Sequence, residues 1–147
     1  MGCFYDHVAL ASTDLDRSVA FYRDVMGFEL SSRRLLKDNR EQAVFHVGEG
    51  VLVIFSHEDG RYAEKVRKPR SGVHHLALGM DAPDYDAVVE RCRAGGVEIR
   101  RQEINRGAKG KGYATYFYDP DGNEIEIKKY VEGDPGFVEY TAEGYHV

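Results

Sequence analysis

An internal repeat constrains the fold of this chain more than any other feature. The first copy begins with residues 6–10 (DHVAL), and the second begins 68 positions later with residues 74–78 (HHLAL). The same offset relates His7 to His75 and Gly27 to Gly95. A repeat at a fixed offset indicates two copies of one supersecondary unit that bury their apolar faces together.

Each copy predicts the element order β-α-β-β-β. After the opening strand, apolar residues at helical spacing predict a helix that begins after Asp14 in the first copy and contains Pro83 in its first turn in the second. The helix-forming residues are Leu15, Val19, Tyr22 and Met26 in the first copy, and Tyr85, Val88, Val89 and Cys92 in the second. The later strands are expected over 28–36, 42–47, 51–57, 97–104, 113–118 and 124–130.

One such copy leaves a sheet face uncovered, so two copies must pair to build a core. We therefore expect a single α+β domain of 147 residues, in which two paired βαβββ modules form a cup-shaped mixed sheet. The modules are placed at 4–57 and 73–130. A charged linker is placed at 58–72, and a glycine-rich acidic tail at 131–147 is expected to pack loosely or against a partner chain.

The composition excludes several function classes. The net charge of −5 argues against a nucleic-acid partner, which usually demands a basic surface. No apolar run is long enough for a membrane span, and residues 1–6 lack the basic and apolar pattern of a secretory signal. The two cysteines are too few for a disulfide framework. We expect a cytoplasmic protein that binds neither nucleic acid nor membranes.

Alternation along three predicted strands places polar side chains on one face and apolar side chains on the other. His7 and His75 each lie on the non-apolar side of their strand, followed two residues later by alanine. On the last strand, Glu124, Glu126 and Lys128 share a side opposite two isoleucines. Small residues beside polar groups leave room, so this face predicts a lined cavity.

A single histidine or acid in such a position is more often a structural residue than a ligand. Pairing of the two halves, however, would bring repeat-equivalent histidines together with an acid on a neighbouring strand. Two imidazoles and one carboxylate on one side of a metal form a facial triad that leaves coordination positions open.

With these features the sequence resembles the vicinal oxygen chelate superfamily. That superfamily includes glyoxalase I, extradiol dioxygenases, fosfomycin-resistance proteins, methylmalonyl-CoA epimerase and bleomycin-resistance proteins. The resemblance spans about residues 4–130, and its motifs are residues 6–10, 21–28, 75–78 and 116–126 (YFYDPDGNEIE). It implies paired modules that form a cup around one divalent metal, and it carries the ligand role onto His7, His75 and Glu126.

The resemblance does not single out one reaction. Members with four protein ligands place a further ligand near the end of the first module's last strand, where this chain has Ile54 and, nearby, Ser56. Extradiol dioxygenases share Tyr116 but have a histidine several residues before it, and residues 106–113 contain none. Fosfomycin enzymes have threonine or cysteine two positions after the first histidine, where this chain has Ala9.

An open three-ligand metal can bind adjacent oxygens of a small substrate and stabilise an enolate, alkoxide or catecholate as a Lewis acid. We expect Fe, Mn, Ni, Zn or Mg, which this ligand set alone does not separate. Tyr116 is a candidate hydrogen-bond donor to a bound oxygen, and Glu124 is a candidate base. The substrate pocket is expected to include Ile54 as an apolar wall, together with Ser56 and Lys109. Of these, Lys109 could bind a carboxylate or phosphate of the substrate.

The leading hypothesis is therefore a divalent-metal-dependent lyase, isomerase or dioxygenase that acts on a small molecule as a homodimer. The alternative is a metal-free protein that sequesters an aromatic ligand between two chains, as bleomycin-resistance proteins do. A third interpretation makes the metal purely structural, although structural sites are usually closed by protein ligands. Buried histidines that face a carboxylate need a partner, which favours the enzyme.

Overall fold

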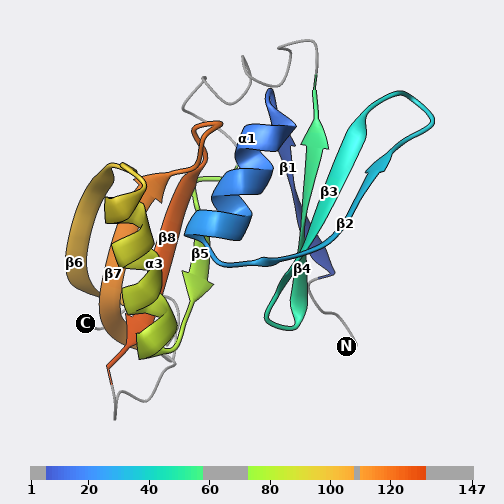
Figure 1. Ribbon diagram of the computed structural model, residues 1–147. Coiled ribbons are helices and arrows are strands. Elements are labelled where there is room, and N and C mark those ends of the chain that lie inside the picture. The colour runs from blue at the N-terminus through green and yellow to red at the C-terminus, as the bar shows by residue number, and fades with distance from the viewer. Residues whose placement is uncertain (1–5, 58–72, 108–109, 132–147) are drawn as a thin grey trace, which may run out of the picture. The chain divides into compact units, whose positions relative to one another are not determined.

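The computed structural model describes residues 6–57, 73–107 and 110–131 of the chain. The predicted linker, Lys109 and the tail beyond Val131 lie outside the described residues. The chain forms two compact units, Met1–Val73 with Asp119–Asn123, and His74–Tyr118 with Glu124–Val147. Figure 1 labels the elements of both. No helix in the described part of the chain is long and apolar enough to cross a membrane.

The first unit contains a four-stranded mixed sheet in the order β1-β4-β3-β2. Its strands are β1 (His7–Ser12), β2 (Glu29–Leu35), β3 (Glu41–Val47) and β4 (Gly50–Ser56). Strand β1 is parallel to β4, and the other neighbours are antiparallel. Helix α1 (Leu15–Ala20) and the π-helical segment η1 (Phe21–Val25) connect β1 to β2, which confirms the predicted element order.

The second unit repeats this arrangement with a sheet in the order β5-β8-β7-β6. Its elements are β5 (Leu76–Gly79), α3 (Ala82–Ala94), β6 (Ile99–Gly107), β7 (Gly110–Tyr118) and β8 (Glu124–Tyr130). Strand β5 is parallel to β8, so the last strand lies between the first strand and β7. Two such mixed sheets with few helices match the predicted fold class.

The helix ends follow from local sequence. The Asp14 carboxylate accepts a hydrogen bond from the Arg17 amide (3.0 Å), which satisfies one of the free N–H groups at the start of α1. The chain leaves η1 through Gly27 at φ 77° and leaves α3 through Gly96 at φ 70°, a backbone conformation that glycine adopts without strain. Pro83 lies in the first turn of α3, as predicted.

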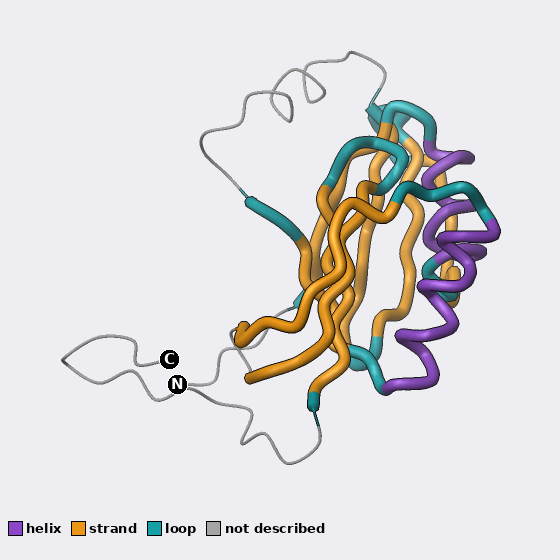
Figure 2. The backbone as a smooth tube through the Cα atoms, turned by 90° about the vertical axis from the view of Figure 1, so that its left-hand side faces the viewer, coloured by secondary structure: helices purple, strands orange, loops and turns teal. Residues whose placement is uncertain are grey.

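In each unit the helix packs on one face of its own sheet (Figure 2). In the first unit the Phe45 ring lies 6.0 Å from the fully buried ring of Tyr22. In the second unit the Tyr85 hydroxyl of α3 lies 2.5 Å from the Thr115 hydroxyl of β7, and Ile125 and Ile127 are fully buried. The opposite face of the second sheet carries the polar side chains.

The turn Asp119–Asn123 does more than reverse the chain. Gly122 closes it at φ 86°, and the two carboxylates of the turn also bind residues of α1, of η1 and of the loop before α1. Asp121 accepts hydrogen bonds from the Thr13 amide (3.0 Å) and the Ser18 hydroxyl (2.5 Å). Asp119 accepts one from the Tyr22 hydroxyl (2.7 Å). The turn is therefore part of the first unit's core, although β7 and β8 on either side belong to the second.

Candidate metal centre

The open face of the second sheet is built by strand register. Glu126 lies opposite Tyr116 of the antiparallel strand β7 and opposite Ala77 of the parallel strand β5. Paired residues in neighbouring strands point to the same face, so these side chains share the side that α3 does not cover. His75 directly precedes β5, and the contact of its Nε2 with Glu126 places it on the same side. The small Ala77 side chain leaves space between the histidine and the carboxylate.

A histidine and a buried carboxylate meet at the centre of this face. His75 Nε2 lies 3.0 Å from Glu126 Oε2, and the Glu126 side chain is 9% exposed. A carboxylate removed from water needs polar partners, and Glu126 has two in His75 and the Tyr116 hydroxyl. Burial and the hydrogen bond with Glu126 raise the pKa of Tyr116, while hydrogen bonds from Asn105 and Arg101 act in the opposite direction.

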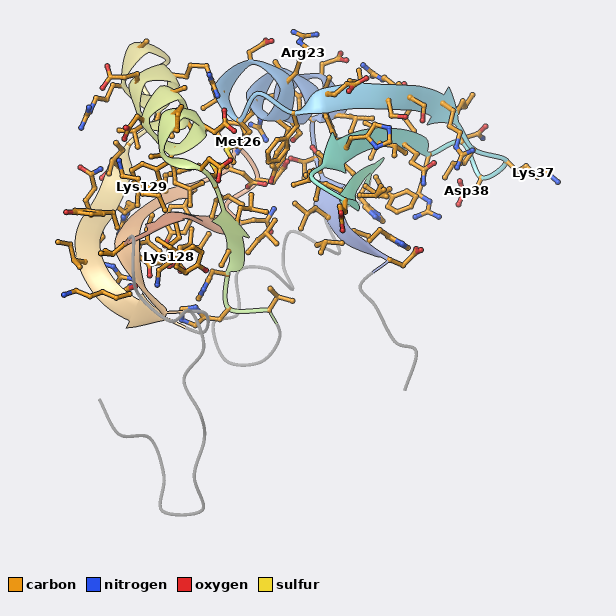
Figure 3. All side chains as sticks on the ribbon, turned by 90° about the horizontal axis from the view of Figure 1, so that it is seen from below. Arg23, Met26, Lys37, Asp38, Lys128 and Lys129 are labelled. Carbon is orange, nitrogen blue, oxygen red and sulfur yellow. The ribbon has the colours of Figure 1, made fainter. Side chains whose placement is uncertain are left out.

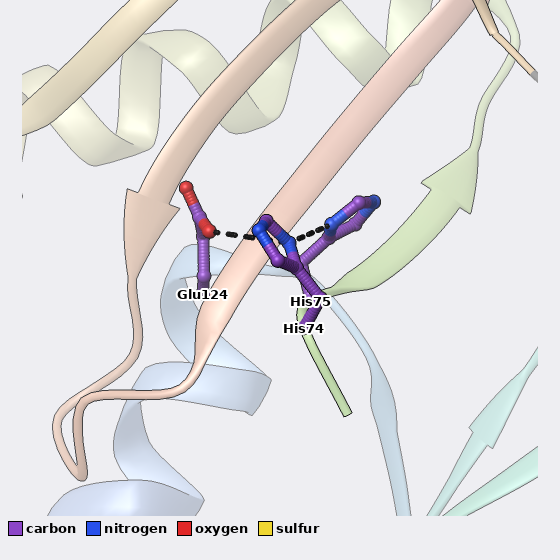
Figure 4. Close-up of side chains that lie close together, drawn as sticks. All are labelled: His74, His75 and Glu124. Carbon is purple, nitrogen blue, oxygen red and sulfur yellow. Dashed lines mark hydrogen bonds and ion pairs between the residues drawn. The ribbon is translucent and has the colours of Figure 1, made fainter. Parts of the chain in front are cut away.

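A second histidine extends the cluster. His74 Nδ1 lies 2.8 Å from His75 Nδ1 and 3.9 Å from Glu124 Oε2 (Figure 4). One ligand atom from each of His74, His75 and Glu124 falls within 4.8 Å of the other two. The sequence analysis missed His74, because alternation counted from His75 assigns it to the opposite side of the strand, whereas both histidines precede β5, where alternation does not yet fix the direction of a side chain. The sequence signal that could have identified His74 is its position directly before His75, the histidine of the repeat.

The donor chemistry fits a divalent transition metal. Imidazole nitrogens and carboxylate oxygens are the ligands that Zn, Fe, Mn and Ni accept. His75 points Nε2 at Glu126 and Nδ1 at His74. A neutral imidazole has one ring nitrogen with a free lone pair, so His75 can offer a metal either Nε2, beside Glu126, or Nδ1, beside His74, but not both at once. Two alternative ligand sets therefore share His75: the first contains Glu126, and the second contains His74 and Glu124.

The structure places the predicted site residues unequally. His75, Glu126, Tyr116 and Glu124 come together on one face of the second unit. His7 lies at the start of β1 in the first unit, where its Nδ1 is 2.6 Å from Asp6 Oδ2 and its side chain is 46% exposed. These two parts of the predicted set thus belong to different units. Lys109 lies outside the described residues.

Two of the predicted pocket residues lie away from the expected cavity face. Ile54 is 1% exposed and pairs with Leu10 and Ala43, on the side of the sheet that contacts Tyr22. The pairing of β1 with β4 puts it opposite Leu10 rather than on the side of His7, so it is a core residue. Ser56 accepts a hydrogen bond from the Glu41 amide (2.8 Å), which uses its hydroxyl within the sheet.

Comparison with known proteins agrees with this architecture. The sequence profile of the Glyoxalase/Bleomycin resistance protein/Dioxygenase superfamily matches residues 5–127. Virulence protein STM3117 of Salmonella typhimurium is 34% identical over 86% of this chain and 83% of its own length. Glutathione transferase FosA of Serratia marcescens is 29% identical over 83% and 77%.

A solved structure shows the same fold. The fosfomycin resistance protein FosX of Listeria monocytogenes, crystallised with Mn(II) and a dihydroxypropylphosphonic acid, superposes with a TM-score of 0.65. It is 21% identical, and the match covers 87% of this chain and 93% of FosX. The repeat, the two mixed sheets and the profile match lead to one conclusion: the chain belongs to the Glyoxalase/Bleomycin resistance protein/Dioxygenase superfamily.

Proposed function

We propose that this protein is a divalent-metal-dependent enzyme that binds a small substrate through adjacent oxygens. The observation that carries the proposal is the pair formed by His75 Nε2 and the buried Glu126 carboxylate, 3.0 Å apart. As the third ligand we propose His7, the repeat equivalent of His75, which gives a set of two imidazoles and one carboxylate. Such a set leaves coordination positions open for a substrate.

The residues around Glu126 have distinct tasks in this proposal. A bound metal would supply Lewis-acid stabilisation of a developing oxyanion. Tyr116 keeps its proton at neutral pH, because burial and Glu126 raise its pKa, so it serves as a hydrogen-bond donor to the Glu126 carboxylate rather than as a base. Glu124 lies on the same face at the start of β8 and is the candidate for accepting a substrate proton.

One solved neighbour supports metal chemistry, and the names of the relatives do not fix the reaction. FosX was solved with Mn(II) and a phosphonic acid that carries adjacent hydroxyl groups. FosA is named a glutathione transferase, and the superfamily name covers glyoxalases and dioxygenases. The reaction of this chain is proposed to be of the lyase, isomerase or dioxygenase type, with Fe, Mn, Ni, Zn or Mg as the metal.

The test is elemental analysis of protein purified without a histidine tag. A stoichiometric metal that is lost in His7→Ala, His75→Ala and Glu126→Gln, and retained in Glu124→Gln, would support the proposed set. Loss in His74→Ala and Glu124→Gln, with Glu126→Gln intact, would instead assign the metal to the second ligand set. His46→Ala is the matched control, because His46 is an exposed histidine of β3.

A metal-free binding role is the second candidate. Tyr118 and Tyr130 lie on the open face, 43% and 42% exposed, and offer aromatic surface to a flat ligand. In this role two copies of the chain would enclose an aromatic molecule, and a homodimer is the expected assembly for the enzyme as well. Protein that takes up none of the five metals, but binds an aromatic compound with a change in tyrosine fluorescence, would favour this role and refute the enzyme.

A further inference from the structure

A buried lysine lies on the same face as the candidate metal centre. Lys128 is 5% exposed, and Figure 3 shows Lys128 and the next residue, Lys129, on opposite sides of the sheet. Lys128 Nζ donates to Asn105 Oδ1 (2.8 Å), to the Gly110 carbonyl (3.0 Å) and to the Asn105 carbonyl (3.4 Å). Among the described residues, no carboxylate oxygen lies within 4.0 Å of this ammonium group. Neutral oxygens of β6 and β7 therefore surround the charge.

The lysine fixes the orientation of the Asn105 amide. An ammonium group only donates, so the amide oxygen must face Lys128 and the amide nitrogen must face away. Asn105 Nδ2 in turn donates to the Glu103 carboxylate and to the Tyr116 hydroxyl, each at 3.1 Å. A flipped amide would set nitrogen against Lys128 and oxygen against the Glu103 carboxylate, so two charges oppose the flip.

The orientation of the amide decides where the Tyr116 proton points. An amide nitrogen cannot accept a hydrogen bond, so the Tyr116 oxygen is the acceptor toward Asn105. The Arg101 guanidinium, whose carbon lies 4.0 Å from the centre of the Tyr116 ring, is also only a donor. Glu126 lies directly opposite Tyr116 in the strand register and is the hydrogen-bond partner that can accept, so the single hydroxyl proton is directed to its carboxylate.

We propose that Lys128 is a positioning residue that, acting through Asn105, aims the Tyr116 hydroxyl at Glu126. The inference rests on the proposed function, because it treats Glu126 as a metal ligand. Hydrogen bonds to a ligating carboxylate fix its orientation and raise metal affinity, and removal of such a partner typically weakens binding about 10-fold to 100-fold. Lys128 thereby favours metal binding despite its own positive charge.

The sign of the effect separates positioning from simple electrostatics. A cation beside a metal centre repels the metal, so electrostatics alone predicts tighter metal binding when the charge is removed. Positioning predicts weaker binding, because Asn105 is released and Tyr116 no longer orients Glu126. A purely structural role of Lys128 would lower the melting temperature without changing the metal affinity of the folded protein.

The experiment is calorimetric titration of the full chain with Mn(II). Lys128→Met and Tyr116→Phe are each expected to weaken binding about 10-fold, and the double variant to bind no more weakly than Tyr116→Phe alone, since both act on one hydrogen-bond path. Lys129→Met is the matched control, because Lys129 lies on the other side of the same strand and pairs with Asp86. It should bind Mn(II) like the wild type.

Other outcomes overturn the inference. Unchanged or tighter binding by Lys128→Met refutes positioning, as does a double variant whose loss is the product of the single losses. If Lys128→Met does not fold, Asn105→Ala tests the same path with the lysine retained, and an unchanged affinity refutes it equally. Wild-type protein that binds neither Mn(II) nor the other candidate metals refutes the proposed function itself, which distinguishes that failure from the failure of this inference.

Discussion

Replacement of Tyr22 by phenylalanine removes one hydroxyl from the centre of the first unit. The Tyr22 side chain is fully buried and donates to Asp119 Oδ2 at 2.7 Å. Burial, followed by the negative charge of Asp119, raises the pKa of Tyr22, so the residue is a neutral hydrogen-bond donor at neutral pH. The substitution leaves the ring and its contacts with Phe28 and Phe45 in place.

The expected cost follows from what Asp119 retains. A hydrogen bond to a charged group contributes about 1.5–3 kcal/mol to stability. Asp119 keeps hydrogen bonds from the Asn123 side chain (2.8 Å) and from the Asp121 and Asn123 amides (3.0 and 2.8 Å). Its carboxylate is therefore not left unpaired, so we expect the lower part of the range, about 1.5–2 kcal/mol. For a domain of about this size, this corresponds to a melting temperature lower by about 3–8 °C.

Thermal denaturation followed by circular dichroism measures this shift. Tyr113→Phe is the matched control, because Tyr113 is 47% exposed and removal of an exposed hydroxyl should change stability by less than about 0.5 kcal/mol. A Tyr22→Phe variant that melts with the wild type would refute the reasoning. So would a Tyr113→Phe variant that loses as much stability as Tyr22→Phe.

Three further predictions concern stability and reactivity. Burial acts to raise the pKa of Asp121, but hydrogen bonds from Ser18 and Thr13 outweigh it, so the pKa is lowered on folding. The ionised carboxylate therefore stabilises the fold above the unfolded-state pKa of about 4, and this stabilisation is lost as pH falls through the folded-state pKa. In urea unfolding, Asp121→Asn should reduce the pH dependence of the free energy of unfolding over that range. Burial raises the pKa of Cys92 to about 11, so in a Cys3→Ser background a disulfide reagent at pH 8 should react slowly with native protein and fast in denaturant. Gly112→Ala should lower the melting temperature, because the new methyl group would clash with the Lys129 carbonyl oxygen. Gly50→Ala, with its nearest contact at 3.5 Å, should be tolerated, and equal losses in both variants would contradict the steric explanation.

Much of the fold could be predicted because local rules and tertiary structure agree. The repeat predicted two βαβββ units, Asp14 predicted the start of α1, and alternation predicted that Glu124 and Glu126 share a face. The comparison with four-ligand members misplaced Ile54, because a position counted along the last strand does not show which side of the sheet meets the helix. The pairing of β4 with β1 decides that side, and pairing is a long-range property.

Parts of the candidate site could not be predicted from local pattern. Alternation counted from His75 assigns His74 to the opposite side of the strand, but both residues precede β5, so the pleat does not fix the direction of either side chain. Lys128 was placed on the polar side of β8, but a lysine there is usually solvated, and its burial depends on acceptors that Asn105 and Gly110 supply from other strands. Networks of this kind depend on strand register across the sheet, which a single sequence does not state.

The turn Asp119–Asn123 has a consequence for dividing the chain into fragments. The two halves have the same element order, and a cut within the segment between Ser56 and Leu76 would divide the chain between the two sets of elements. A fragment that ends there would lack the acceptors for Tyr22 and Ser18, because Asp119 and Asp121 are encoded in the second half. The first fragment should therefore gain structure when mixed with a second fragment that carries this turn, and less when the turn's two aspartates are replaced by asparagine. The first module thus depends on a short peptide from the second half for its buried hydrogen-bond acceptors, although the strands of that half form a different sheet.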